Sequence, residues 1–302
     1  MLGKIKTAYR LLISNRKVLL VALMKNLSFL FPDKLYLQLM FYCRTGHKLD
    51  LKNPLTFNEK LQWLKLYNRN TLYTTLVDKY AVKEYVTKLI GNEHIVPTLG
   101  VWNCVEDIDF DELPNQFVLK TTHGSGGDVI ICKDKSKFNK EKAINHLKKS
   151  IKKDVYNVLR EWPYKNVPKR IIAEKYMEDE SGELRDFKVL CFGGVPKMTE
   201  YHQGRFKSHT QDFYDENWTL LPIYQGTPLS GKVMEKPAFF DEMMSLSSML
   251  SKDMPHVRVD WYYVQNQLYF GELTFFDASG FEDFEPEEYN RILGDWIKLP
   301  NL

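Results

Sequence analysis

The sequence feature that most constrains the fold is the segment VRVDWYYVQNQLYFGELTFF, residues 257–276. Apolar and polar residues alternate on both sides of its polar centre, which predicts two antiparallel strands joined by a short turn. With Asn266 at the centre of the turn, Asp260 lies directly opposite Glu272 on one face of the sheet. The chain is therefore expected to contain an antiparallel sheet that holds two carboxylates side by side.

Two like charges in directly opposite positions destabilise a strand pair, because their Cβ atoms lie only about 5 Å apart. A divalent cation between Asp260 and Glu272 would remove this repulsion, and magnesium typically binds through one or two carboxylates together with substrate phosphates. Arg258, which faces Thr274 in the same register, offers an alternative that needs no metal. A one-residue bulge in the hairpin is a further alternative.

A second informative segment is KTTHGSGG, residues 120–127, between the strand-like runs 117–120 and 128–132. A phosphate-binding P-loop has its lysine after the glycines and leads into a helix, whereas Lys120 precedes them. The glycine spacing also differs from the dinucleotide-binding fingerprint. We therefore expect a glycine-rich loop between two strands, which either folds over phosphates or is a plain hairpin turn.

Composition sets wider limits. The 302 residues, 44% of them apolar, can bury one large core or two to three modest ones, and the formal charge of only +3 argues against a nucleic-acid partner. The four cysteines match neither zinc nor redox spacing, which favours a reducing, cytoplasmic location.

The N-terminal apolar run, residues 18–24, superficially resembles a signal peptide, but it is short and lacks a cleavage site. It is also too short to span a bilayer. Either this helical extension packs on the body, or it rests peripherally on the anionic inner face of the membrane.

Further elements point to an α+β protein. A capping box from Thr56 to Glu59 opens a helix over 56–67, and a second helix over 78–90 ends at Gly91. Residues 170–177 and 185–192 have the composition and alternation of strands.

In chain order, a lysine before a glycine loop, two further strands and a hairpin with two carboxylates suggest nucleotide chemistry. At this point the chain resembles the ATP-grasp superfamily, and within it the TupA-like branch named after teichuronopeptide synthesis. The resemblance extends from about Leu49 to the C-terminus. It rests on KNPLTFNEKLQWLKLY, DKYAVKEYV, LPNQFVLKTTHGSGG, EKYM, DFKVLCFGG, RVDWYYV and FGELTFF.

The resemblance implies an α+β ATP-grasp fold that holds the nucleotide between two α+β subdomains built on antiparallel sheets, after a helical N-terminal extension. We expect four segments: the extension at 1–48, a helical or αβ subdomain at 49–110, the subdomain with the glycine-rich flap at 111–178, and the subdomain with the metal site at 179–302.

It also implies a set of nucleotide contacts. Lys79 and Lys120 are similar to the two lysines that contact the ATP phosphates. The flap whose backbone N–H groups cover the phosphates corresponds to His123, Gly124, Ser125, Gly126 and Gly127. The hinge that contacts adenine through main-chain groups corresponds to Glu174, Lys175, Tyr176 and Met177, with Glu183 at the ribose.

For catalysis, Asp260 and Glu272 match the Mg²⁺ ligands, and Lys188 resembles the later phosphate or acyl-phosphate contact. Arg258 resembles the cation that stabilises the tetrahedral intermediate. Thr274, a weaker ligand, stands where the superfamily often has asparagine at the second metal position. Separately from the resemblance, the polar stretch EYHQGRFKSH makes His202 and Arg205 candidate acceptor contacts.

The implied activity is an ATP- and Mg²⁺-dependent carboxylate–amine ligase that forms an acyl phosphate and then an amide. Its partners would be ATP, a uronic-acid-containing saccharide or polymer of a bacterial surface polysaccharide, and an amine or amino acid. One alternative is a capsule glycosyltransferase, for which Asp107, Asp109 and Asp111 form a D-x-D-like motif. An ATP-grasp kinase and a nucleotide-gated scaffold are the others.

Overall fold

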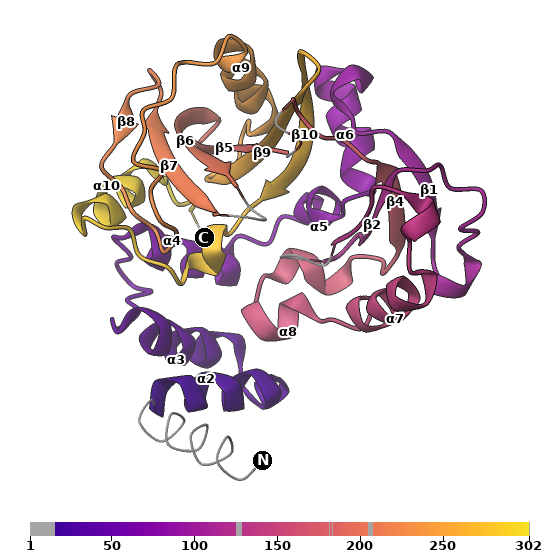
Figure 1. Cartoon of the computed structure of the whole chain (residues 1–302). Helices are drawn as coiled ribbons and strands as arrows, with labels where there is room; N and C mark the ends of the chain where they lie inside the picture. The colour runs from indigo at the N-terminus through magenta and orange to yellow at the C-terminus, as the bar shows by residue number, and fades with distance from the viewer. Residues whose placement is uncertain (1–15, 125–128, 181, 183, 205–207, 302) are drawn as a thin grey trace, which may run out of the picture.

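The computed structural model describes residues 16–124, 129–180, 182, 184–204 and 208–301. Two antiparallel sheets form its centre, and helices surround them (Figure 1). The α+β architecture expected from the sequence is confirmed.

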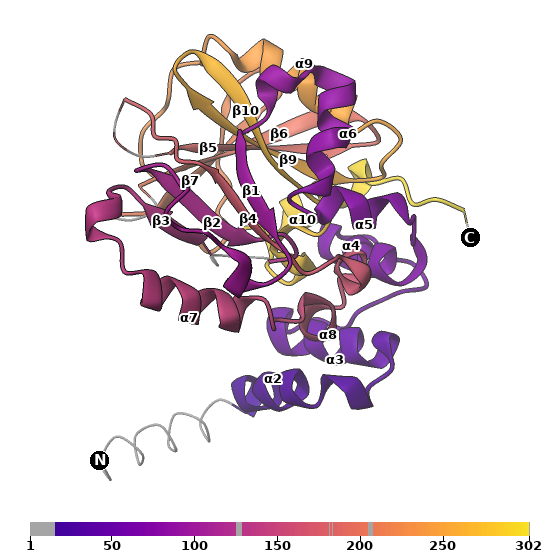
Figure 2. The ribbon, with the colours of Figure 1, turned by 90° about the vertical axis from the view of Figure 1, so that its right-hand side faces the viewer.

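The N-terminal helices lie together at one end of the molecule, as both views show (Figures 1 and 2). They are α2 (Arg16–Asn26), the 3-10 helix η1 (Ser28–Leu30) and α3 (Asp33–Thr45). Their shared interior is a separate apolar cluster that includes Met24, Tyr36 and Met40. Among the described residues, no helix combines the length and apolar character needed to cross a membrane.

Three helices lead from this end to the first sheet: α4 (Phe57–Tyr67), α5 (Leu72–Val77) and α6 (Ala81–Ile90). The predicted capping box is present, since Thr56 Oγ1 accepts from the Glu59 N–H and the Glu59 carboxylate accepts from the Thr56 N–H. Helix α6 ends before Gly91, as predicted, because that glycine has a φ of +98°.

The four-stranded sheet has the order β1-β4-β2-β3. Its strands are β1 (Thr98–Trp102), β2 (Phe117–Thr121), β3 (Val129–Cys132) and β4 (Ile171–Lys175). The remaining elements of this region are η2 (Asn92–His94), η3 (Val105–Asp107), η4 (Lys135–Lys137), α7 (Lys140–Ser150), α8 (Val155–Leu159) and η5 (Trp162–Asn166). Leu147 of α7 packs with Phe117 and Leu119 in the core beneath the sheet. Strand β1, from segment 49–110, thus pairs with β4 from segment 111–178.

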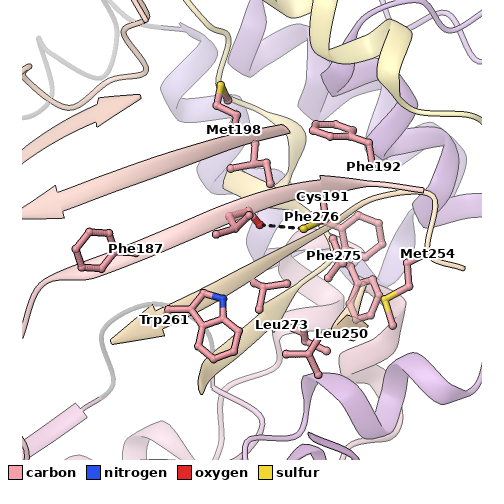
Figure 3. Packing of buried hydrophobic residues seen from close by; sticks show 14 of the residues in the cluster. Phe187, Cys191, Phe192, Met198, Leu250, Met254, Trp261, Leu273, Phe275 and Phe276 are labelled. Atoms are coloured by element: carbon pink, nitrogen blue, oxygen red, sulfur yellow. Dashed lines mark hydrogen bonds between the residues drawn. The ribbon is translucent and has the colours of Figure 1, made fainter. Parts of the chain in front are cut away.

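The six-stranded sheet has the order β10-β9-β5-β6-β7-β8. Its strands are β5 (Asp186–Phe192), β6 (Val195–Gln203), β7 (Thr210–Asp215), β8 (Leu220–Leu221), β9 (Val257–Val264) and β10 (Gln267–Thr274). The helical elements around it are α9 (Phe240–Leu250), η6 (Asp277–Gly280) and α10 (Glu288–Trp296). Figure 3 shows its apolar interior, where Trp261 lies in the buried cluster with Leu250 of α9. The indole N–H of Trp261 donates to Ser247 Oγ of α9 at 2.8 Å, which fixes this face of the sheet as the core face.

The hairpin of β9 and β10 confirms the carboxylate pair but corrects the turn. Gln265 and Asn266 both have positive φ, so the turn has two residues and Gln267 faces Val264, one residue out of step with the prediction. A bulge at Gly271 then shifts the register by one. Beyond the bulge Glu272 faces Asp260 as predicted.

Candidate active site

A row of charged side chains crosses four adjacent strands on the face of the six-stranded sheet opposite α9. Direct register pairs join Glu272 on β10 to Asp260 on β9, Asp260 to Lys188 on β5, and Lys188 to Glu200 on β6. Directly paired residues share a face, so the four side chains form one continuous polar row.

Arg258 lies at the centre of the ionic contacts around this row. Its Nε and Nη2 donate to the two oxygens of Asp260 at 2.7 and 2.8 Å, and its Nη1 donates to Asp277. Burial opposes the charged form, but Asp260 and Asp277 raise the pKa of Arg258 well above its usual value. Burial likewise opposes ionisation of Asp260, yet Arg258 and Lys188, whose Nζ lies 2.6 Å from Asp260, lower the pKa of this carboxyl. Both groups are therefore charged.

Asp277 is positioned by an unusual turn. Within η6, Ala278 and Ser279 have φ values of +43° and +54°, a left-handed conformation that is costly for residues with a side chain. The buried Lys65 of α4 supports the turn by donating to the carbonyl and the hydroxyl of Ser279, each at 2.8 Å. The position of the Arg258 partner therefore depends on a helix some 200 residues earlier in the chain.

Glu272 is the accessible member of the carboxylate pair. Its side chain is 37% exposed, and the Lys79 ammonium lies 2.5 Å from it. Burial would raise its pKa, but Lys79, Lys188 and Arg258 outweigh burial and hold the pKa well below its usual range. Thr274 Oγ1 lies 3.4 Å from Glu272 Oε1.

The carboxylate pair fits a magnesium ion that also binds phosphates. Within the described ranges, no cluster of three or more histidine, cysteine, aspartate or glutamate side chains has metal-binding geometry. Two ionised carboxylates, Asp260 and Glu272, would nevertheless supply the protein ligands of a magnesium ion whose shell phosphate oxygens complete.

Lys79 is fixed at the junction of the two sheets, in the turn between α5 and α6. Its N–H donates to the carbonyl of Thr122, directly after β2, at 3.0 Å. The preceding residue, Asp78, accepts from the N–H groups of Tyr80 and Ala81. The backbone therefore holds Lys79 in place while its ammonium reaches Glu272 on the other sheet.

Beside the four-stranded sheet, one lysine of α6 and one of β2 share a buried glutamate of β4. Lys83 and Lys120 lie 2.6 and 2.5 Å from the carboxylate oxygens of Glu174. Burial would raise the pKa of Glu174, but Lys120 and Lys83 outweigh this effect and lower the pKa. Lys83 also donates to the Val96 carbonyl and to Thr98 Oγ1, each at 2.8 Å. A cleft between the sheets is lined by Lys79, Lys83, Ile95, Val96, Lys120, Glu174, Tyr262, Phe270 and Gly271.

The structure places part of the predicted flap and hinge around this cleft. His123 and Gly124 are buried directly after β2, and a Cβ at Gly124 would lie 2.5 Å from Thr121 Oγ1. Ser125, Gly126 and Gly127 lie outside the described residues, as do Glu183 and Arg205. In the hinge, the Lys175 N–H donates to the Pro97 carbonyl at 3.0 Å. Tyr176 Oη donates to Glu178 at 2.6 Å, and Met177 is half-buried.

His202 lies on the same face as the charged row, at the β6 end. Its ring contacts Glu200 and His209 at 3.1 and 3.0 Å.

The D-x-D-like motif lies elsewhere. Its three aspartates are exposed, whereas the intervening Ile108 and Phe110 are buried in the core of the four-stranded sheet. Asp109 Oδ1 accepts from the Asp111 N–H at 2.8 Å, so the motif closes a local turn. This arrangement gives no support to the glycosyltransferase alternative.

Sequence reasoning missed three charged residues of the site: Lys83, Glu200 and Asp277. The Gly193-Gly194 turn by itself would have paired Lys188 with Thr199, but a bulge shifts the register so that Glu200 faces Lys188. Asp277 follows the hairpin directly, and no local pattern signals its contact with Arg258. The only sequence signal for Lys83 was its position one helical turn after Lys79.

The two antiparallel sheets, with two lysines at Glu174 beside one and paired carboxylates on the other, agree with the ATP-grasp fold expected from the sequence. A family model described as TupA-like ATPgrasp matches residues 59–298, and the chain belongs to this family. No curated protein matches the sequence significantly.

Solved structures show weaker similarity. D-alanine–D-alanine ligase from Bacillus anthracis complexed with ATP is 17% identical, over 74% of this chain and 63% of that chain, with a TM-score of 0.42. The Helicobacter pylori D-alanine–D-alanine ligase is 13% identical, over 80% and 69% of the chains, with a TM-score of 0.45. The ADP complex of N5-carboxyaminoimidazole ribonucleotide synthetase is 12% identical, over 79% and 56%, with a TM-score of 0.44. The chain thus spans 63% of the first of these proteins, and the family assignment rests on the family model.

Proposed function

We propose that this protein is an ATP- and Mg²⁺-dependent carboxylate–amine ligase that modifies a bacterial surface polysaccharide or its precursor. It would join an amine or amino acid to a uronic acid through an acyl phosphate. The observation that carries the proposal is the pairing of Asp260 with Glu272 beside three cations, Lys79, Lys188 and Arg258. The polysaccharide part of the proposal rests on the name of the TupA-like branch, which refers to teichuronopeptide synthesis.

In this proposal the lysines bind the triphosphate. Lys120 and Lys79 lie on the two sides of the cleft, where compact ammonium groups suit phosphate oxygens. A magnesium ion held by Asp260 and Glu272 would offset the charge of the transferring phosphoryl group. Positioning and electrostatic stabilisation of this kind account for most of the catalysis of phosphoryl transfer.

Arg258 and Lys188 act on the acyl group. Arg258 is kept charged by Asp260 and Asp277, so it can stabilise the oxyanion that forms when the amine attacks the acyl phosphate. The overall reaction converts a carboxylate, an ammonium group and ATP into an amide, ADP, inorganic phosphate and one proton. Among the residues assigned here, none is a covalent nucleophile.

The test is a substrate screen with the full chain, ATP and magnesium, in which glucuronate and galacturonate are combined with a panel of amino acids. We expect ADP release that needs both a uronate and an amine, and a product whose mass equals the sum of the substrates minus water. A product that gains phosphate would show a kinase instead, and turnover of a nucleotide sugar without ATP would show a glycosyltransferase.

We also propose that the N-terminal helices contact the inner face of the membrane. Six large apolar side chains of α2, η1 and α3 are exposed: Leu19, Leu20, Leu23, Phe29, Leu30 and Leu35. Lys25 and the exposed Lys34 lie in the same segment and suit anionic lipid headgroups. This surface lies at the end of the molecule away from the six-stranded sheet (Figure 1).

A further inference from the structure

Glu200 continues the charged row beyond the reacting groups, and the proposed mechanism gives it no role. It faces Lys188 directly across β5 and β6, and Lys188 in turn binds Asp260. Its side chain is almost fully buried, at 1% exposure. Its Oε1 has no hydrogen-bond partner among the described residues. A buried carboxylate oxygen that lacks a hydrogen-bond partner beside the reacting groups can accept a hydrogen bond from a substrate.

The other oxygen of Glu200 begins a chain of hydrogen bonds. Oε2 lies 3.1 Å from His202 Nε2, and His202 Nδ1 lies 3.0 Å from His209 Nε2. Gln211 Nε2 also donates to Oε2, at 3.3 Å. Exposure increases along the chain, since Glu200 and His202 are buried and His209 is partly exposed. A continuous line of proton-carrying groups thus joins the active-site row to solvent.

We propose that Glu200 binds the ammonium group of the amine substrate and accepts its proton, which His202 and His209 then pass to solvent. This inference rests on the ligase function proposed above. It assigns the β6–β7 side of the row to the amine, and the side of Asp260 and Glu272 to the nucleotide.

The proton balance of the reaction agrees with one such exit path. The ammonium group loses one proton to Glu200, and its freed electron pair attacks the carbonyl carbon of the acyl phosphate. The new C–N bond forms as the C–O bond to phosphate breaks, and the departing phosphate takes the second proton from nitrogen. Once Glu200 is protonated, its O–H donates to His202 Nε2, with both imidazoles in the Nδ1–H tautomer. The proton then moves to His202 Nε2, from His202 Nδ1 to His209 Nε2, and out from His209 Nδ1. This leaves both rings in the Nε2–H tautomer, in which His202 donates to the ionised Glu200, and exchange of the ring protons with solvent restores the starting tautomer.

The electrostatic surroundings of Glu200 are compatible with this role. The charged groups near it are Lys188 on β5, Arg258 and Asp260 on β9, Asp277 in η6 and Glu282 after η6, with His202 on its own strand. Burial raises the pKa of Glu200, although Arg258 and Lys188 oppose the effect. A carboxyl group with a raised pKa is a stronger base than an exposed one.

The experiment compares two nucleophiles with glucuronate, ATP and magnesium. Hydroxylamine is largely uncharged at neutral pH and captures the acyl phosphate as a hydroxamate without a base. An amino acid is an ammonium ion and needs one. For Glu200→Gln we expect hydroxamate formation within about threefold of wild type and amide formation lower by about 10²-fold or more. Raising the pH should restore the amide rate, because it supplies free amine.

His209→Gln should lower amide formation less than Glu200→Gln does, and should shift the pH profile of amide formation, because only the outer end of the proton path is lost. Glu216→Gln, an exposed glutamate that pairs with Lys197, is the matched control and should change neither rate. If Glu200→Gln lowers both products equally, or neither, Glu200 is not the base and the inference fails while the ligase function stands. If wild type gives neither hydroxamate nor amide with any uronate of the screen, the proposed function fails, and this inference fails with it.

Discussion

The two sheets that form the cleft carry opposite balances of charge. On the four-stranded sheet one glutamate, Glu174, is shared by two lysines. At the six-stranded sheet four carboxyl groups lie around three cations. The carboxyl groups are Asp260, Glu272 and Glu200 of the sheet and Asp277 of η6, and the cations are Lys188 and Arg258 of the sheet and Lys79 of the α5–α6 turn.

This difference matches the two halves of a magnesium–ATP complex. The side with an excess of lysine suits phosphate oxygens, and the side with an excess of carboxylate suits a metal ion and an ammonium group. The lysine-rich side would bind a metal ion or an ammonium group poorly, and the carboxylate-rich side would bind phosphate oxygens poorly. Substitutions on the two sides should therefore give different defects, and these defects test the comparison.

The largest effect is expected from Glu272→Gln, which removes a carboxylate charge while keeping the shape of the side chain. We expect turnover to fall by about 10²- to 10³-fold. The cost in stability should be small, because Glu272 is partly exposed and the glutamine amide oxygen can still accept a hydrogen bond from Lys79. The measurement is ADP release across a magnesium titration, with the exposed Asp241→Asn as control. Full activity of Glu272→Gln would show that Glu272 is not a metal ligand.

A second prediction concerns acid stability, because the interior near the six-stranded sheet holds a buried imidazole. His256 lies between the rings of Phe57 and Phe192, at centroid distances of 5.0 and 4.8 Å, and burial lowers its pKa to about 4. An unfolded histidine binds its proton near pH 6.5, so the unfolded state binds more protons below that pH. The free energy of unfolding should therefore fall by roughly 3 kcal/mol as the pH drops from 6.5 to 4.

Chemical denaturation at several pH values measures this slope. His256→Gln cannot titrate and should show a flatter dependence, whereas the exposed His47→Gln should behave as wild type. An unchanged slope in His256→Gln would assign the acid sensitivity to other groups.

On the lysine-rich side, Lys120→Met should raise KM for ATP by about ten- to a hundredfold, the loss expected for one charge-assisted contact. Glu174 keeps Lys83 as a partner, so the fold should persist. Lys83→Met is the matched comparison: it removes two further hydrogen bonds, to Val96 and Thr98, and should lower stability more than ATP affinity. A reversed pattern would make Lys83 the phosphate contact.

The smallest effect concerns the N-terminal helices, whose described residues are absent from the cleft lining. The double substitution Leu23→Ser and Phe29→Ser should weaken binding to anionic phosphatidylglycerol vesicles several-fold, since each exposed apolar side chain adds a modest term. Activity in the absence of vesicles should not change. Val233→Ser, which alters an equally exposed apolar residue elsewhere, is the control. Equal vesicle binding by all three proteins would contradict a membrane contact.

The elements of the fold were largely predictable, because local patterns determine them. A few neighbouring residues determine each of three features: the capping box at Thr56, the glycine that ends α6, and the alternation along β9 and β10. The opposition of Asp260 and Glu272 was predicted from an incorrect turn, and the bulge at Gly271 compensated for that error. Whether a bulge forms depends on the packing of the whole sheet. The pairing of Glu200 with Lys188, which depends on a bulge, could therefore not be predicted from the local sequence.

The sequence alone therefore determined the strands, the lysine before the glycine loop and the two carboxylates of the hairpin. Only the tertiary structure decided which cation meets which carboxylate, since Lys79 reaches Glu272 and Lys65 supports the turn of Asp277 across about 200 residues of chain. The physical reason is range: propensity and periodicity act over a few residues. The charge of a buried side chain depends instead on partners that packing brings together from distant parts of the chain.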